Sequence, residues 1–281
     1  MTAVFALGFA LVTAPVLAAN APRRVVSFNV CADQLVLALA DPEQIAGLSP
    51  YAADSSLSAM ADKARAFPRL DWQAESTIAL APDLVLIGDT DRPVTKHVLR
   101  ALGLRLEEIT LISDLATARR QITQVAAVLG HPERGERLLA DIEAARARLH
   151  AAPKTPFHTA LLVNRGGYTA GASSLAAVLL AEAGLKPPEG APSGYGGYVP
   201  LEKLMTLHPD VIVLNDRPSE AADQGSYNLE HPALNALYPP QRRIVLPTRY
   251  TLCGGPALVA AFDYLAGLLE RIAQSATMRT N

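Results

Sequence analysis

Short apolar runs alternate along the chain with longer segments in which apolar residues recur at helical spacing. The run at 23–30 predicts a strand, the segment at 31–44 a helix, and the run at 45–50 a second short strand. The pattern resumes with a strand at 158–164 and a helix at 173–185. Alternating strands and helices are typical of parallel βα units. We therefore expect an α/β fold with mostly parallel sheets.

One fifteen-residue pattern occurs twice, as ESTIALAPDLVLIGD at 75–89 and as EKLMTLHPDVIVLND at 202–216. Each copy reads as a short amphipathic helix, a Pro-Asp turn, and an apolar run that ends on an aspartate. Proline cannot continue the helix, and the apolar run suits a strand that is buried on both faces. At a fixed offset of 127 residues, five positions are identical: Glu75 and Glu202, Leu80 and Leu207, Pro82 and Pro209, Asp83 and Asp210, Asp89 and Asp216.

The repeat has two interpretations. Helix, Pro-Asp turn and strand form a common connection, so the five identities could be chance. Alternatively, the copies mark two similar α/β lobes, and a pair of lobes implies a cleft between them. We take the second interpretation as the working prediction.

A long helix is predicted between the two lobes. It begins at Glu133, directly after Gly-His-Pro, and continues to His150 without a proline. Eighteen helical residues span roughly 27 Å, which is enough to cross from one lobe to the other. The alternative is one more surface helix of the first lobe. The linking interpretation divides the chain into an N-terminal lobe at 20–132, a linking helix at 133–152 and a C-terminal lobe at 153–281.

Residues 1–19 have the pattern of a secretory signal peptide. The segment is almost entirely apolar from Val4 to Leu17, and it ends in small residues that suit cleavage after Ala18 or Ala19. It is too short for a comfortable membrane span, although no Lys or Arg precedes the apolar run. A retained anchor or a buried helix are the alternatives. We expect an exported protein.

Net charge bears on the partner of this protein, and cysteine content bears on its compartment. The net charge is −2 and the sequence has no basic block, which argues against nucleic acid as a partner. The chain has two cysteines, Cys31 and Cys253, and we expect it in an oxidising compartment. They form either a disulfide or two free thiols. A disulfide requires Cα atoms within about 7 Å, and the sequence does not give that distance.

Ligands of parallel α/β lobes bind at the loops that follow the carboxyl ends of the strands. Only 5% of the residues are aromatic, yet several fall on or beside such predicted loops. Flat rings with polar tips suit a large, flat, partly apolar ligand, although Trp72 and Tyr198 could instead cover the lobe cores. The aromatic residues in these places are Phe28, Tyr51, Trp72, Tyr168, Tyr195, Tyr198 and Tyr250.

Catalytic patterns are missing from the sequence. No histidine falls on a predicted strand-end loop, and no nucleophile, base and orienting group are arranged as in an enzyme. A binding protein therefore fits better than an enzyme, with no catalytic residue and no metal site. Two alternatives stay open. A bare metal ion could be held by Cys31, Asp33, Asp89 and Cys253, or an exported enzyme could use Cys31 or Cys253 as its nucleophile.

From 24 to 272 the chain resembles the periplasmic solute-binding proteins of ABC importers for iron chelates, haem and cobalamin. The segment DWQAESTIALAPDLVLIG at 71–88 resembles the tryptophan-bearing segment of the cobalamin-binding member. The loops LSPYA at 48–52, RGGYTAG at 165–171 and TRYTLCGGP at 248–256 resemble its cleft loops. The resemblance implies two lobes joined by one rigid helix, with the ligand in the cleft. It implies ligand-cleft positions for Tyr51, Trp72, Tyr168, Tyr198, Arg249 and Tyr250.

Three differences from the cobalamin-binding member bear on the ligand. Trp72 is three residues nearer the Pro-Asp turn than the family's tryptophan, and Tyr198 stands near where a second tryptophan is expected. Cys31 and Cys253 have no close parallel there. The ligand therefore stays open among a corrinoid, haem and a ferric siderophore.

The resemblance also implies how the protein meets its partner. In this family one exposed acidic residue on each lobe docks on arginines of the membrane permease, and Glu75 and Glu202 fall on those positions. Their alternative role is that of ordinary carboxylates at helix starts. We thus expect a monomeric periplasmic protein whose partners are an inner-membrane ABC importer permease and a small-molecule metal chelate. No prosthetic group is expected.

Overall fold

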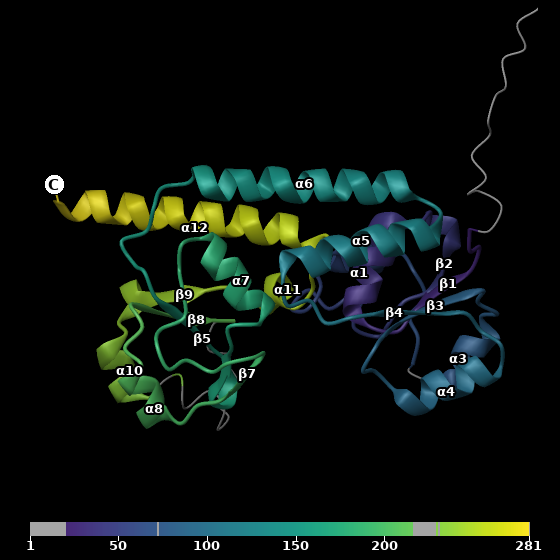
Figure 1. Cartoon of the computed structure of the whole chain (residues 1–281), viewed down its shortest axis with the longest axis horizontal. Coiled ribbons are helices and arrows are strands. Elements are labelled where there is room, and N and C mark those ends of the chain that lie inside the picture. Colours follow the sequence, from purple (N-terminus) through teal and green to yellow (C-terminus); the bar gives the residue numbers. More distant parts are fainter. Residues whose placement is uncertain (1–20, 72, 216–228, 230, 281) are drawn as a thin grey trace, which may run out of the picture.

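Figure 1 shows the computed structural model of the chain, which describes residues 21–71, 73–215, 229 and 231–280. The predicted signal peptide at 1–19 lies outside the described residues. So do Trp72 and Asp216, the last residue of the second repeat copy. The described chain forms two α/β lobes, each built on its own sheet.

The N-terminal lobe contains a four-stranded, all-parallel sheet with the order β2-β1-β3-β4. All five residues of β3 are buried, which explains why this segment reads as one continuous apolar run. The strands are β1 (Val25–Ser27), β2 (Ile45–Gly47), β3 (Leu84–Gly88) and β4 (Leu106–Ile109). The helices are α1 (Val30–Leu39), α2 (Ala61–Ala64), α3 (Ala74–Ala79), α4 (Pro93–Ala101) and α5 (Leu115–Leu129), with a 3₁₀ turn η2 (Pro42–Gln44).

The C-terminal lobe contains a five-stranded sheet with the order β7-β6-β5-β8-β9. Three strands are parallel, and β6 and β7 add an antiparallel edge. The strands are β5 (Ala160–Val163), β6 (Tyr168–Ala170), β7 (Gly196–Tyr198), β8 (Val211–Leu214) and β9 (Arg243–Val245). The helices are α7 (Leu175–Glu182), α8 (Leu201–Thr206), α10 (Pro232–Leu237), α11 (Thr248–Thr251) and α12 (Ala257–Thr280), with 3₁₀ turns η3 (Arg165–Gly167) and η4 (Pro240–Arg242).

Two segments that were expected to be loops contain regular structure. In the segment 165–171, β6 pairs antiparallel with both β5 and β7, and Thr169 is fully buried. In the segment 248–256, four residues form the short helix α11. Both elements are too short to leave a periodic signal, so their structure depends on tertiary contacts.

Helix α6 (Pro132–Ala151) runs beside α12 along one side of both lobes (Figure 1) and packs against α5 and α12. Near its start, Arg134 donates to the Leu39 carbonyl at 3.0 Å and pairs with Asp41. Towards its end, Arg146 forms a bidentate pair with Glu182 of α7, at 2.7 and 2.9 Å. The helix is therefore anchored in both lobes, and we keep the division at 133–152 as a proposal.

The two repeat copies have the same local structure. Helix α3 and helix α8 both contain six residues and begin 127 positions apart. After each helix the chain passes through a left-handed residue, with φ of 45° at Ala81 and 44° at His208. Each copy then enters a strand that lies beside the first strand of its own sheet. The correspondence extends to backbone angles, which chance identities at a common connection do not explain.

The repeated aspartate has the same role in both copies. The carboxylate of Asp83 accepts from the backbone N–H groups of Arg23 and Arg24, at 2.7 and 2.9 Å. The carboxylate of Asp210 accepts from those of His158 and Thr159 at the same two distances. In each lobe the aspartate thus ties the start of its own strand to the chain that enters the neighbouring first strand.

The apolar core is continuous across the two lobes. One cluster of buried residues includes Leu86 of β3, Ala145 of α6, Leu162 of β5 and Phe262 of α12. Two smaller clusters cover the other face of each sheet, one around Phe28 and one around Ile212. In the part of the chain that the structure describes, no helix is both long and apolar enough to span a membrane.

Candidate ligand-binding site between the lobes

Arg249 of α11 reaches from the C-terminal lobe to the N-terminal lobe. Its Nη1 donates to the carbonyl of Ser55 at 3.4 Å, and Ser55 lies in the same turn region as Tyr51. Its guanidinium lies 4.9 Å from the ring centre of Tyr250, close enough for a cation–π contact. Tyr51 is 52% exposed. The structure therefore brings three predicted residues, Arg249, Tyr250 and Tyr51, to facing segments of the two lobes.

Tyr168 and Tyr198 form a second group at the antiparallel edge of the C-terminal sheet. They are register partners of β6 and β7, and their rings meet edge to face at 5.7 Å. The Tyr168 hydroxyl donates to the Tyr195 carbonyl at 3.3 Å. Tyr198 is 80% exposed, so its ring does not cover the lobe core. Tyr198, together with the half-buried Tyr168, offers a stacking surface.

A cavity of about 300 Å³ lies between the lobes, and Tyr168 and Tyr195 form part of its wall. Leu111 and Ile112, which follow β4, line it from the N-terminal lobe. The C-terminal lobe supplies most of the wall, from β5, β6, the start of α7, and α11. Those residues include Asn164, Tyr168, Ser174, Leu175, Ala176, Tyr195, Asn215, Thr248, Thr251 and Leu252.

Sequence reasoning did not single out Asn164 and Asn215. They directly follow β5 and β8, whose last residues, Val163 and Leu214, are register partners. The two asparagines therefore lie side by side at the carboxyl edge of the sheet. Their position after adjacent strands was visible in the sequence, but the strand pairing was not.

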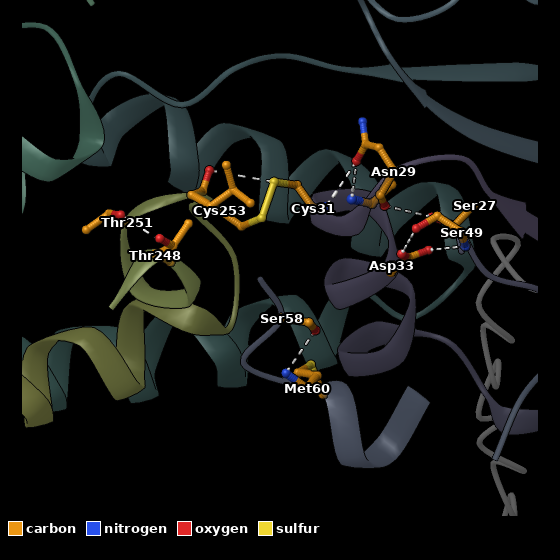
Figure 2. The surroundings of a disulfide bond; sticks show 12 residues. Ser27, Asn29, Cys31, Asp33, Ser49, Ser58, Met60, Thr248, Thr251 and Cys253 are labelled. Atoms are coloured by element: carbon orange, nitrogen blue, oxygen red, sulfur yellow. Dashed lines mark hydrogen bonds between the residues drawn. A yellow bond between two sulfur atoms is a disulfide. The ribbon is translucent and has the colours of Figure 1, made fainter. Parts of the chain in front are cut away.

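Cys31 and Cys253 form a disulfide, with an S–S distance of 2.12 Å and Cα atoms 5.1 Å apart (Figure 2). It joins the first turn of α1 to the loop after α11, and so connects the two lobes. The same loop approaches the N-terminal lobe closely: a Cβ at Gly254 would lie 2.6 Å from the side chain of Ile112. While the disulfide is intact, neither cysteine is free to act as a nucleophile or to bind a metal as a thiolate.

The carboxylate of Asp33, two residues after Cys31, is hydrogen-bonded within the fold. It is fully buried, and its carboxylate accepts from the Ser49 N–H at 2.9 Å and from the Ser49 hydroxyl at 2.5 Å (Figure 2). Burial raises the pKa of Asp33 to about 6, against the hydrogen bonds from Ser49, which lower it. Among the described residues, no three His, Cys, Asp or Glu side chains are grouped to hold a metal ion. The metal set that includes Asp33, Asp89 and both cysteines is therefore not assembled.

The sequence profile described as "Periplasmic binding protein" matches residues 25–238, about three quarters of the chain. The chain belongs to this family of periplasmic binding proteins. It is a family of binding proteins and not of enzymes. No curated protein matches the sequence.

Solved structures of periplasmic binding proteins share the fold of this one. The haem-binding protein BhuT, solved with two haems, has a TM-score of 0.71 at 24% identity, covering 89% of this chain and 98% of that chain. The haem-binding protein RhuT from Roseiflexus sp. RS-1 has a TM-score of 0.70 at 24% identity, covering 89% of this chain and 99% of that chain. The vitamin B12 binding protein BtuF of Vibrio cholerae has a TM-score of 0.66 at 13% identity, covering 90% of this chain and 98% of that chain. At these identities the likeness establishes the fold.

Glu75 and Glu202 occupy equivalent places in this periplasmic binding protein. Both are exposed, and each lies in the first turn of its helix, α3 or α8. The two helices lie towards opposite ends of the molecule, on the side away from α6 (Figure 1). A partner that meets this side can therefore contact one acidic residue on each lobe.

Proposed function

We propose that this protein is the substrate-binding component of an ABC importer, and that it carries a metal chelate such as a corrinoid, haem or a ferric siderophore. The observation that carries this proposal is the inter-lobe site of a chain in the periplasmic binding protein family. A cavity lined in part by Tyr168 and Tyr195 lies between residues of both lobes, and the chain matches a family of binding proteins. The chelate is cargo and not a resident cofactor.

The chemistry of the candidate site supports a large ligand that is flat and partly apolar. Tyr168 and Tyr198 offer ring surface, and Arg249 offers a cation beside Tyr250 for an anionic group. The haem-binding and vitamin B12 binding proteins that share the fold bind ligands of this kind. Trp72 stays a candidate from sequence alone.

The test is a thermal-shift and absorbance screen of the purified chain against cobalamin, haem and several ferric siderophores, with bare metal ions as a separate arm. We expect one chelate to raise the melting temperature and the bare ions to leave it unchanged. Stabilisation by an ion alone would replace the proposal with metal-ion binding. The absence of binding to any chelate would refute it.

The aromatic pair is tested by Tyr198→Ala. Because Tyr198 is 80% exposed, the variant should keep its stability and lose about tenfold in affinity for the chelate found in the screen. Val94→Ala is a matched control, because Val94 is 77% exposed on α4 of the other lobe. Unchanged affinity in Tyr198→Ala would remove this tyrosine from the site.

We further propose that Glu75 and Glu202 dock on cationic residues of the permease. The double variant Glu75→Arg, Glu202→Arg should bind its chelate normally and should no longer support transport in vesicles that contain the importer. Glu136→Arg on α6 is the control, because Glu136 is exposed on the linking helix, on the other side of the molecule from α3 and α8. Normal transport by the double variant would show that the two glutamates are ordinary surface carboxylates.

Export to the periplasm as a monomer completes the proposal. The family is periplasmic, and residues 1–19 have the pattern of a cleaved signal. The mass of the protein recovered from a periplasmic fraction tests cleavage after Ala18 or Ala19. Sedimentation of the same sample tests the monomer.

A further inference from the structure

We propose that the inter-lobe cavity between the carboxyl ends of β5 and β8 and the start of α7 is a subsite for a primary amide group of the ligand. The proposal rests on the proposed function, because it assigns the part of the chelate that enters this cavity. It is carried by two kinds of polar group that the fold leaves without partners at one place. They are the amide oxygens of Asn164 and Asn215 and the first backbone N–H groups of α7.

The acceptors come from the paired asparagines. The Oδ1 atoms of Asn164 and Asn215 are buried, and neither has a hydrogen-bond partner among the described residues. Buried amide oxygens without partners destabilise a fold, so each such case calls for an explanation. Both residues line the cavity. Rotation about χ2, a soft torsion, is enough to turn either oxygen towards a group that enters it.

The donors come from helix α7. Leu175 and Ala176 are its first two residues, and both line the cavity. Their N–H groups have no acceptor within the helix because the first turn of any α-helix lacks one. The N-cap residue Ser174 accepts a hydrogen bond from the next N–H group, that of Ala177, at 3.2 Å. Its hydroxyl is therefore not the acceptor for the N–H groups of Leu175 and Ala176.

A primary amide matches this arrangement because it donates and accepts at once. Its NH₂ group can donate to Asn164 and Asn215, while its carbonyl accepts from the N–H groups at the start of α7. A carboxylate would also be attracted to the helix start and to the asparagine NH₂ groups, but it has no proton to donate to the asparagine oxygens and leaves both of them unpaired. The cavity therefore favours a chelate with amide arms over one with carboxylate arms.

The experiment compares two probes that share a corrin ring. Dicyanocobinamide carries primary amides, and dicyanocobyrinic acid carries carboxylates in their place. By titration calorimetry on the whole protein, we expect the amide probe to bind about tenfold more tightly, since each extra hydrogen bond changes affinity a few-fold. Haem, whose peripheral arms are carboxylates, is the third probe and should bind more weakly than cobinamide.

The double variant Asn164→Leu, Asn215→Leu should lose most of this preference and bind dicyanocobinamide about tenfold more weakly. Its ligand-free melting temperature should not fall, because the leucines remove two buried amide oxygens that lacked partners. The double variant Asn164→Asp, Asn215→Asp keeps the acceptor oxygens, so it should still bind dicyanocobinamide and should discriminate further against dicyanocobyrinic acid.

Asn29→Leu is the contrasting control. Asn29 also follows a first strand, but its side chain accepts from Cys31 N and Ala32 N and donates to Asp91. This variant should lose stability and keep the preference for amides.

Equal binding of the two corrin probes, or unchanged binding in the Leu double variant, would overturn the amide subsite. A wild-type protein that binds haem but neither corrinoid would also overturn it and leave the proposed function standing. If the protein binds no chelate of any class, the proposed function fails, and the subsite fails with it.

Discussion

The two lobes share one building plan but differ in the segment that comes after the first strand. In both, a six-residue helix, a left-handed residue and an aspartate lead into a strand beside the first one. In the N-terminal lobe, β1 continues almost directly into α1, which Asn29 caps. In the C-terminal lobe, β5 turns into the antiparallel strand β6, and Tyr168, Tyr195 and Tyr198 lie on or beside this edge. The repeated part builds the scaffold, and the part that is not repeated supplies most of the candidate site.

The largest effect should come from separating the lobes at the disulfide. The double variant Cys31→Ala, Cys253→Ala should lose roughly 3–5 kcal/mol of unfolding free energy, because the closed loop is long. Calorimetry should still show one transition, since one apolar cluster joins both lobes. Two resolved transitions would mean that the disulfide, and not the shared core, makes the lobes one cooperative unit.

The lobes also differ in that the N-terminal lobe contains a buried carboxylic acid, Asp33, with a raised pKa. Of the described residues, Asp33 is the only carboxylic acid that is fully buried, and it belongs to the N-terminal lobe. Burial raises its pKa to about 6, so between about pH 4 and 6 the unfolded chain loses a proton that the folded chain keeps. Stability should therefore fall as pH rises through this window, by on the order of 3 kcal/mol.

Urea unfolding from pH 3.5 to 7 measures this effect of Asp33. The variant Asp33→Asn should lack the fall, because the amide does not titrate. Asp210 should act in the opposite direction at lower pH. Hydrogen bonds from His158 N and Thr159 N lower its pKa below 3.8, so its contribution is present above that value and is lost as pH falls further. A wild-type profile that is flat from pH 4 to 6 would contradict the assignment to Asp33.

The repeated aspartates test whether the two copies are energetically equivalent. Asp83→Ala and Asp210→Ala each leave two backbone N–H groups without their carboxylate, which should cost roughly 2 kcal/mol in either lobe. Asp62→Ala, at a surface ion pair with Arg65, should cost almost nothing. A more than twofold difference between the two repeat variants in urea unfolding would show that the copies share geometry but not energetics.

The smallest effect belongs to the left-handed residues. Ala81→Gly and His208→Gly should each stabilise the protein by about 0.5 kcal/mol, since glycine removes the strain of positive φ but adds entropy to the unfolded chain. The two changes should be additive, because they lie in different lobes. Destabilisation by either glycine would show that its side chain makes contacts that outweigh the backbone strain.

Much of the scaffold could be predicted from the sequence, because it repeats and because buried parallel strands are long apolar runs. The strand β6 could not, since three residues gain their structure only by pairing with β5 and with β7, almost thirty residues further along. The pattern placed Tyr51 and Tyr250 on predicted strand-end loops, whereas Arg249 was implied only by the family resemblance. Asn164 and Asn215 become neighbours only through strand register, and the bond between Cys31 and Cys253 depends on a distance that no spacing encodes.

The position of the disulfide along the chain also has a consequence for the order of assembly. Cys253 follows Cys31 by 222 residues and comes after the last strand of the second sheet. In a chain that is delivered from its N-terminus, Cys31 has no other cysteine of the chain to pair with until both sheets have arrived. The native bond can then form readily only when the two lobes have docked against each other. Oxidation of this pair thus reports that the whole two-lobe protein has been assembled.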